Sequence, residues 1–589
     1  MRVPRRGEIQ MKWTAVWRCG FGAVVLAAPG LAFGVQCGDT LTADTVLDAD
    51  VVCPSTFTGT ALIIGADGIT LDGNGFWLDA PSAEEGLAVG AHSGVTVKNL
   101  TVAARNWAIT SCDKPQCARG AGYGPAGIGN TYSNLAIQNG GTGRGLSLVH
   151  SDGNTVSGVT TTDVLEPVYL LGSDDNQIAG VVPSWSAETL AAKPTGAVGV
   201  QFIGSQRNAL TGSAIHGAYV AVSIQGDPAN ASWEARAADG NEVVGNDLSG
   251  NANGIVFGTH GSGTRIASND LSASGNYAVK IDGDSGASLQ GNTFTGSANG
   301  ISLANLRGAT LAGPDLSSIT GIGLFLNGVS SSSFSDLQVG GAFGIKLKGS
   351  SGNTFHGAQV APAIGITGTY GIWAYSDSTG NLFEETSVSL YPTGVYLQSP
   401  ENSFQCGYLI GNVSVGLHSD KVKGTLANLN VIEGNVGVYN TVDTAAPAST
   451  DATLNWWGAA DGPRTSGPYD GLHSYVSSDV SYDPWISDPA HLDAPCGRNL
   501  DPAAACSGLV EQIHAFGFRK GTDKSLTAIA EAVCRKIDAG LTGAAIEQLD
   551  AFVHHVDSQT DTLDHEKTIA DQSAADLIQT ALDLQALLE

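Results

Sequence analysis

The sequence predicts an all-β right-handed parallel β-helix solenoid, followed by a small all-α helical domain. A short phrase returns along the chain: a small residue, an apolar residue, any residue and another apolar residue. From Ala278 onward its copies lie 22, 23, 21, 27, 23 and 22 residues apart. Beyond about residue 507 the apolar period changes from 2 to 3.6, which predicts the helices. The phrase begins at Gly145, Ala278, Gly300, Gly323, Gly344, Gly371, Gly394 and Gly416.

A fixed period in the low twenties, with alternation inside each copy, indicates a solenoid in which each repeat forms one coil. Apolar residues point inward and stack on the coil below, so each coil is buried only by its neighbours. Leucine-rich repeats have a similar length, but their Leu-x-x-Leu-x-Leu spacing is absent here. A parallel β-helix, whose coils carry two or three short strands joined by Gly, Asn and Ser turns, is the better match.

A second phrase, Asn followed by a short apolar strand and Gly, runs in step with the first. Asn246, Asn269 and Asn292 are 23 residues apart each time. We expect these asparagines to occupy left-handed turn positions, where their side chains can bond to the backbone or to each other.

Composition excludes two broad classes. Only 14% of residues are charged, but 42% are hydrophobic and periodic, so the chain is not disordered. The formal net charge is −28, which argues against nucleic acid as a partner, because a phosphate backbone attracts a basic surface. Such acidity suits solubility outside the cell and occasional cation binding.

Residues 1–34 are predicted to be an export signal. Basic residues from Arg2 to Arg18 precede the apolar run Phe21 to Leu31, and Ala32-Phe33-Gly34 offers small residues for cleavage. The run is too short for a membrane span, and no lipid-attachment pattern precedes Cys37. We therefore expect a protein that is secreted, periplasmic or on the cell surface, without a transmembrane segment.

Eight cysteines remain after Cys19 leaves with the signal, an even number for an oxidising compartment. No Cys/His cluster has zinc spacing, so no metal site is predicted. Proximity in the sequence suggests the disulfides Cys37–Cys53, Cys112–Cys117 and Cys506–Cys534, which leaves Cys406 and Cys496 as the remaining pair.

Two phrases near the N-terminus resemble the first coils of the pectate-lyase-like β-helix superfamily. They are Gly68-Ile-Thr-Leu-Asp-Gly-Asn-Gly75 and Gly94-Val-Thr-Val-Lys-Asn-Leu-Thr-Val102. The resemblance covers roughly Cys37 to Trp485. It implies the fold but no particular chemistry, because this fold hosts lyases, hydrolases, epimerases, phage tailspikes and adhesins.

The segment Asn455-Trp456-Trp457-Gly458 with the following Gly-Pro pairs resembles the last coil of several secreted bacterial β-helix proteins, including copper-accessory periplasmic ones. Aromatic residues that seal the final coil explain it better than a ligand site does. The copper alternative is weak, because Met1 and Met11 are the only methionines and both lie in the predicted signal.

Domain boundaries follow from these patterns: solenoid 35–488, linker 489–507 and helical domain 508–589. Helices are expected near 508–516, 523–539, 542–556 and 564–588, and this pattern resembles the small helical domain called FIMAH. The resemblance implies an attachment or interaction module. Three stretches that break the solenoid period, 103–133, 181–195 and 227–240, are either walls of a binding cleft or tolerated insertions.

Catalytic signatures of the fold are absent. The polygalacturonase-like set, the Asp-Pro-His-Glu of alginate epimerases and a pectate-lyase calcium and arginine constellation are not found. Asp174-Asp175 is interpreted as a solvated acidic turn. Asp282 and Asp284 could hold a structural calcium, although a solvated turn is the alternative. No cofactor is required.

One positive feature is an outward-facing column. The middle residue of each phrase must point outward, and stacked coils put neighbours about 4.8 Å apart. The column is therefore an aromatic stripe with lysines, and aromatic rings suit sugars while lysines attract carboxylates or sulfates. It comprises Lys280, Ser302, Phe325, Lys346, Trp373, Tyr396, His418 and Tyr439, with Lys348 beside it.

We favour a non-catalytic module that binds an extracellular polysaccharide or cell-envelope component, or that serves as a surface scaffold. The alternative is a polysaccharide lyase or epimerase acting on an anionic polysaccharide, with Lys346, Tyr396 or His418 as base and Lys280 or Lys348 neutralising the sugar carboxylate. A structural adhesin without sugar affinity is the second alternative, because aromatic residues also favour strand surfaces for packing reasons alone.

Overall fold

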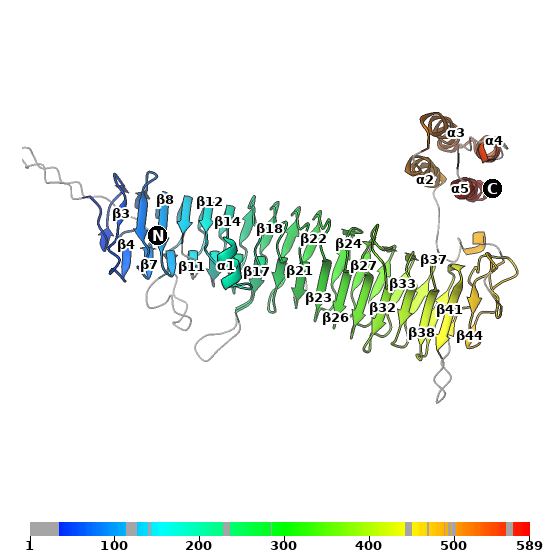
Figure 1. Cartoon of the computed structure of the whole chain (residues 1–589), viewed down its shortest axis with the longest axis horizontal. Helices are drawn as coiled ribbons and strands as arrows, with labels where there is room; N and C mark the ends of the chain where they lie inside the picture. Colours follow the sequence, from blue (N-terminus) through cyan, green and yellow to red (C-terminus); the bar gives the residue numbers. More distant parts are fainter. Residues whose placement is uncertain are drawn as a thin grey trace, which may run out of the picture.

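The computed structural model describes residues 34–112, 127–138, 143–227, 236–283, 286–441, 450–467, 470–487, 489–492, 496, 502–516, 518–560, 569 and 571–588. The predicted export signal, apart from Gly34, lies outside these residues, as do Cys117 and Asp284. From residue 34 the chain winds into an elongated solenoid of about 16 coils, which runs from the blue to the yellow part of Figure 1.

One long sheet, here called sheet A, runs along the whole solenoid. It has 18 described strands, which pair in parallel from each coil to the next. Its strands are β1 (Asp39–Leu41), β4 (Thr60–Ile64), β7 (Glu85–Ala88), β9 (Trp107–Ser111), β11 (Arg144–Val149), β13 (Glu166–Leu171), β15 (Val198–Ile203), β17 (Val220–Gln225), β19 (Asn253–Phe257), β21 (Tyr277–Asp282), β23 (Asn299–Ala304), β26 (Ile322–Asn327), β29 (Phe343–Lys348), β32 (Tyr370–Tyr375), β35 (Thr393–Leu397), β38 (Val415–Asp420), β41 (Val436–Thr441) and β43 (Tyr475–Val476).

Sheet B closes the N-terminal half, again with parallel pairs. It contains β2 (Thr45–Val46), β3 (Val51–Val52), β5 (Thr70–Asp72), β6 (Trp77–Ala80), β8 (Thr96–Ala104), β10 (Thr131–Gln138), β12 (Thr155–Thr162), β14 (Gln177–Ser184), β16 (Ala209–Thr211), β18 (Glu242–Val244), β20 (Arg265–Ala267) and β22 (Ser288–Gln290).

Two further sheets close the C-terminal half, so the coils there carry three strands. Sheet C contains β24 (Thr310–Ala312), β27 (Ser333–Ser335), β30 (Thr354–His356), β33 (Leu382–Glu384), β36 (Ser403–Gln405), β39 (Thr425–Asn428), β42 (Thr450–Asp451) and β44 (Val480–Ser481). Sheet D contains β25 (Asp315–Leu316), β28 (Gln338–Val339), β31 (Gln359–Val360), β34 (Ser387–Ser389), β37 (Tyr408–Asn412) and β40 (Val431–Gly434).

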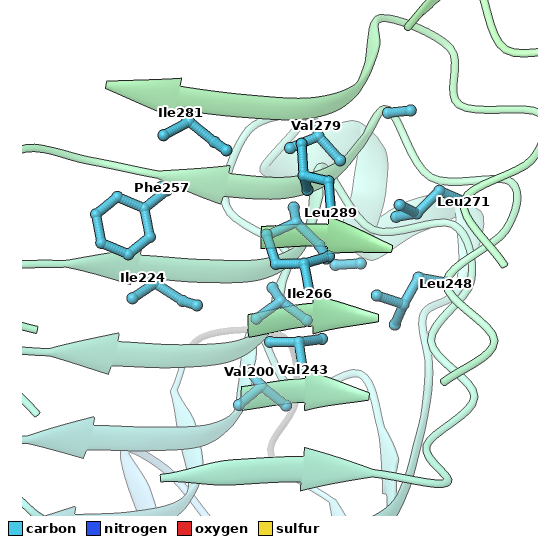
Figure 2. Close-up of a cluster of buried hydrophobic side chains, with 14 of the residues drawn as sticks. Val200, Ile224, Val243, Leu248, Phe257, Ile266, Leu271, Val279, Ile281 and Leu289 are labelled. Carbon is cyan, nitrogen blue, oxygen red and sulfur yellow. The ribbon is translucent and has the colours of Figure 1, made fainter. Parts of the chain in front are cut away.

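The core is a stack of inward side chains, as the alternation predicts. Figure 2 shows Ile224, Phe257 and Ile281 of sheet A one above another, beside Val243 and Ile266 of sheet B. In the C-terminal half, four phenylalanines of sheet C stack with centroid distances of 4.8, 4.7 and 6.4 Å. They are Phe334, Phe355, Phe383 and Phe404, all at most 1% exposed.

The asparagines of the second phrase form ladders between coils, and the expected bonds of their side chains to the backbone and to each other are present. The expected left-handed positions are wrong for Asn246, Asn269 and Asn292, none of which has a positive φ. The side chain of Asn381 donates to Ser350 O and to Asn402 Oδ1, both at 2.9 Å. Its own Oδ1 accepts from the backbone N–H and the side-chain amide of Asn353. A buried amide satisfies backbone groups of the neighbouring coils, while glycines such as Gly153 and Gly158 take the positive φ.

Three predicted disulfides are present: Cys37–Cys53, Cys406–Cys496 and Cys506–Cys534. Cys112 is also disulfide-bonded, and its predicted partner lies outside the described residues. Of the predicted break at 103–133, residues 113–126 lie outside the described residues. On either side of them, β9 joins sheet A and β10 joins sheet B. The predicted insertion 181–195 contains the short helix α1 (Ala187–Ala192).

The C-terminal domain is helical as predicted. Helix α2 begins six residues before the predicted start, within the stretch predicted as linker, and its first residue is a proline, which suits the first helical position. None of the helices in the described residues is long and apolar enough to cross a membrane. After the 3-10 turn η1 (Pro489–Leu492), the helices are α2 (Pro502–Ala515), α3 (Lys520–Asp538), α4 (Thr542–Thr560) and α5 (Asp571–Leu588).

Candidate functional site

The register of sheet A stacks the predicted outward residues in one continuous column. Lys346 pairs with Trp373, Trp373 with Tyr396, and Tyr396 with His418. The same column runs from Lys280 through Ser302 and Phe325 to Lys346, and from His418 to Tyr439.

Two flanking columns, which the sequence reasoning missed, widen this stripe. Most sheet A strands in this half have six residues, and in strands β26, β29 and β32 the first and last residues are at least partly exposed as well as the predicted fourth one. Strands β29 and β32 pair Phe343 with Tyr370 on one side of Lys346 and Trp373, and Lys348 with Tyr375 on the other. The missed signal was the residue three positions before and the residue two positions after each predicted one.

The rings of neighbouring coils contact one another. Trp373 stacks on Tyr375 at 4.3 Å between centroids and on Phe343 at 5.7 Å. Tyr370 lies 4.8 Å from Tyr396. We call this surface the platform; it consists of Phe325, Phe343, Lys346, Lys348, Tyr370, Trp373, Tyr375 and Tyr396, all half-buried or, for Lys348, exposed.

Lys346 lies inside a cage of aromatic rings. Its Nζ is 4.6 Å from the centroid of Trp373 and 5.1 Å from that of Phe343. Tyr375 and Phe325 follow at 5.5 and 5.7 Å. Ring quadrupoles attract the ammonium. Burial, together with the nearby charge of Lys348, lowers the pKa of Lys346.

Tyr396 belongs to a polar chain beside the cage. Its hydroxyl donates to Asp420 Oδ2 at 2.8 Å and accepts from Gln398 Nε2 at 3.1 Å. Trp373 Nε1 donates to Gln398 Oε1 at 3.0 Å, so the chain fixes the indole as well. Burial, and then the bond to Asp420, raises the pKa of Tyr396 to about 12. The phenol therefore stays protonated at neutral pH and is a poor base.

His418 is half-buried one coil further along. Its Nε2 lies 2.7 Å from Thr441 Oγ1, and its ring centroid lies 5.0 Å from that of Tyr396. Burial lowers the pKa of His418, while Asp420 opposes that effect. The imidazole is therefore neutral at pH 7. Lys346 is three coils away in the same column, about 14 Å, so the three catalytic candidates do not converge on one point.

The two ends of the column differ. Lys280 is exposed, with Nζ 5.8 Å from the ring of Tyr277. Ser302 faces outward but is only 9% exposed, because its small side chain lies below its neighbours. Tyr439 at the far end is 39% exposed. Lys280 therefore lies at one end of the column and Lys346 at its middle, and the Tyr396–Asp420 pair lies in the other half.

The interpretation of Asp174-Asp175 as a solvated turn is wrong for Asp174. Its side chain is only 13% exposed and pairs with Arg236 at 2.5 Å and Arg207 at 3.4 Å. Arg207 also pairs with Asp175 at 2.8 Å. Both arginines come from later coils, and Arg236 lies in the predicted insertion 227–240, so no local pattern could show these pairs.

Of the two candidate calcium residues, the structure describes only Asp282. Asp282 Oδ1 accepts a bond from Asn305 Nδ2 at 2.8 Å, and Asp284 lies outside the described residues. Within the part of the chain that the structure describes, no three His, Cys, Asp or Glu side chains are grouped to hold a metal ion.

Comparison with known proteins gives one family match. A profile of the family described as "Periplasmic copper-binding protein (NosD)" matches residues 223–385. That segment contains no cysteine or methionine, and its two histidines are His260 and His356. His356 lies 3.5 Å from Glu384 and Glu385. Copper favours thiolate, thioether and clustered imidazole ligands, so these residues do not fit a copper site.

Solved structures share the fold at low identity, and a search of curated proteins finds no match. The periplasmic alginate epimerase AlgG is 11% identical over 73% of this chain and 81% of its own, with a TM-score of 0.19. The Dettilon tailspike protein is 12% identical over 65% and 62%, with a TM-score of 0.27. The DFA-IIIase from Arthrobacter chlorophenolicus A6 is 10% identical over 75% and 87%, with a TM-score of 0.24. Likenesses of this size concern the fold and carry no inference about chemistry.

Proposed function

We propose that the platform on sheet A binds an extended, anionic polysaccharide without turning it over. The observation that carries the proposal is the three-column surface in which accessible aromatic rings surround and flank Lys346 and Lys348. Aromatic side chains offer apolar area to sugar rings, and the lysines supply charge for carboxylates or sulfates. In a chain of net charge −28, this cationic strip is a local exception.

The geometry suits a polymer that lies along the solenoid axis. Outward residues repeat with the coil spacing of about 4.8 Å, so successive sugars meet similar surroundings. Because Trp373 and Tyr375 already stack on each other, they offer a sugar their outer faces and edges. Lys280 extends the cationic end three coils beyond Lys346.

Binding is favoured over catalysis because two of the three candidate bases, Tyr396 and His418, have no lysine beside them among the described residues. Tyr396 is held protonated by burial and by Asp420. His418 is neutral, but Lys346 and Lys348 lie about 14 Å from it along the column. A lyase or epimerase remains the alternative, and the adjacency of Tyr396 and His418 is the observation that favours it. A scaffold or adhesin without sugar affinity is the third candidate.

The disulfides and the periplasmic family match fit an extracellular or periplasmic location. In that setting the helical domain, held by Cys506–Cys534, would serve as an attachment module. We propose this role because the helical pattern resembles the FIMAH domain, for which an attachment or interaction module is expected.

A glycan array combined with a lyase screen tests the proposal. The full chain is compared with a Trp373→Ala/Tyr396→Ala double variant, with matched folding confirmed by melting. We expect the parent chain to bind arrayed uronate or sulfated polysaccharides and the double variant to lose this binding. Neither protein should release an unsaturated product that absorbs in the ultraviolet. Released unsaturated product would establish a lyase instead. If neither the parent chain nor the double variant binds any polysaccharide, the result would favour the scaffold without sugar affinity.

A further inference from the structure

A row of exposed aliphatic side chains borders the platform, and no role has yet been assigned to it. Ile364, Leu390 and Val413, here called the ridge, are 105%, 62% and 68% exposed. They lie in the turns that lead from sheet D to sheet A in three consecutive coils. Soluble proteins usually show apolar residues singly on their surfaces, whereas grouped ones mark interaction sites.

The three turns are neighbours in space. Leu390 Cδ2 lies 3.8 Å from the position of a Cβ on Gly411, which is in strand β37 two residues before Val413. The backbone N–H of Val413 donates to Tyr391 O at 2.8 Å. The loop that carries Ile364 packs on the ring of Tyr391 through Gly368, where a Cβ would meet the ring at 2.5 Å.

The ridge rests on a rigid support. Tyr391 is buried, and its hydroxyl donates to Gly341 O at 3.0 Å. Burial raises the pKa of Tyr391, so the phenol keeps its proton. The ridge is thus presented by fixed turns rather than by a loosely packed loop.

Two features of the ridge turns are not explained by the needs of folding. Leu390 has φ 64°, a left-handed conformation that a bulky residue seldom adopts and that Leu429 and Leu454 also show in later coils. The interval from Gly344 to Gly371 is 27 residues against 21 to 23 in the neighbouring coils, and the added loop places an isoleucine outermost. An observed strain of this kind supports a functional hypothesis.

We propose that the ridge docks on the surface of a lipid bilayer that carries anionic headgroups. Ile364 protrudes fully, so its partner must yield around it, as acyl chains do. Tyr370 and Trp373, on strand β32, follow Ile364 in the chain, and Lys346 lies on the neighbouring strand β29. Aromatic residues with lysines are the groups that lie at membrane interfaces. This proposal shares the platform residues with polysaccharide binding, but the ridge that carries it lies outside the platform.

A second copy of the chain fits the ridge less well. Three side chains cover far less than the roughly 800 Å² per partner of a stable protein interface. Few aliphatic side chains give only weak membrane binding alone, comparable to a single acyl chain, and a second, electrostatic signal is then needed. Lys346 and Lys348 supply that signal, while the acidic remainder of the molecule is repelled by the same membrane.

Co-sedimentation with vesicles tests the proposal. The full chain is mixed with phosphatidylcholine vesicles, with or without phosphatidylglycerol, at low salt. The ridge variant is Ile364→Asn/Leu390→Asn/Val413→Asn, in which asparagine tolerates the left-handed position. A matched control, Val46→Asn/Val52→Asn, changes two valines that are 63% and 65% exposed near the other end.

We expect binding to the anionic vesicles, at least a tenfold loss in the ridge variant, and no loss in the control. High salt should weaken the binding. Equal binding by the ridge variant, or none by the parent chain, overturns the proposal. A ridge-dependent dimer without vesicles overturns it in favour of a second copy. The ridge variant should still bind polysaccharide on the glycan array. Failure of the membrane proposal and failure of the proposed function can therefore be told apart.

Discussion

Replacing Trp373 by alanine should weaken polysaccharide binding without unfolding the solenoid. Trp373 is half-buried, is the ring closest to Lys346, and is held by Gln398. A fully buried aromatic side chain covers 150–250 Å², of which roughly half remains for a ligand to cover. At about 25 cal/mol per Å², this area corresponds to about 2 to 3 kcal/mol. The dissociation constant should rise about 30- to 150-fold.

Isothermal titration of the full chain with a polyuronate measures this change. Tyr219→Ala is the matched control, because Tyr219 is an aromatic residue 37% exposed outside the platform. Melting curves of both variants should overlap with that of the parent chain. An unchanged dissociation constant in Trp373→Ala, or an equal rise in Tyr219→Ala, would refute the assignment of the site.

Three further predictions concern the solenoid and its titrating groups. Asn381→Ala removes four buried side-chain hydrogen bonds, and unsatisfied partners cost about 1–3 kcal/mol each, so we expect a loss of about 3–5 kcal/mol. Denaturant unfolding would show it, and a loss below about 1 kcal/mol would contradict the role of the ladder. Two aspartates raise the pKa of His473 above 6.5, so its stabilising effect is complete below that pH and is lost as pH rises through the raised value. Melting temperatures of His473→Gln and parent should converge with rising pH, and a constant difference would contradict this. Asp420→Asn should lower the pKa of Tyr396 from about 12 part of the way toward 10, because burial remains, and phenolate absorbance would report it. No change on titration would show that the bond to Asp420 has no influence.

The column of outward residues could be predicted because strand geometry has a fixed period of 2. One phrase per coil was enough to place Lys346, Trp373 and Tyr396 on one line. The flanking rings Phe343 and Tyr375 were missed because the phrase was taken as the whole strand, whereas the strands extend beyond it on both sides.

Contacts between distant coils could not be predicted from a local pattern. Asp174 looked solvated because its partner Arg236 comes 62 residues later, after an insertion. The ladder asparagines looked like turn residues, because that is their commonest use. Only the closed coil shows that Asn381 faces inward, where its amide satisfies backbone groups of its neighbours.

Zero-length carbodiimide coupling of a uronate oligosaccharide to the full chain tests the central claim most directly. The reagent joins a carboxylate only to an amine that it contacts, and mass spectrometry identifies the lysine. The account predicts coupling at Lys280, Lys346 and Lys348, with coupling at Lys346 and Lys348 reduced in Trp373→Ala. Coupling confined to lysines away from sheet A, such as Lys98 on strand β8 of sheet B, would contradict it.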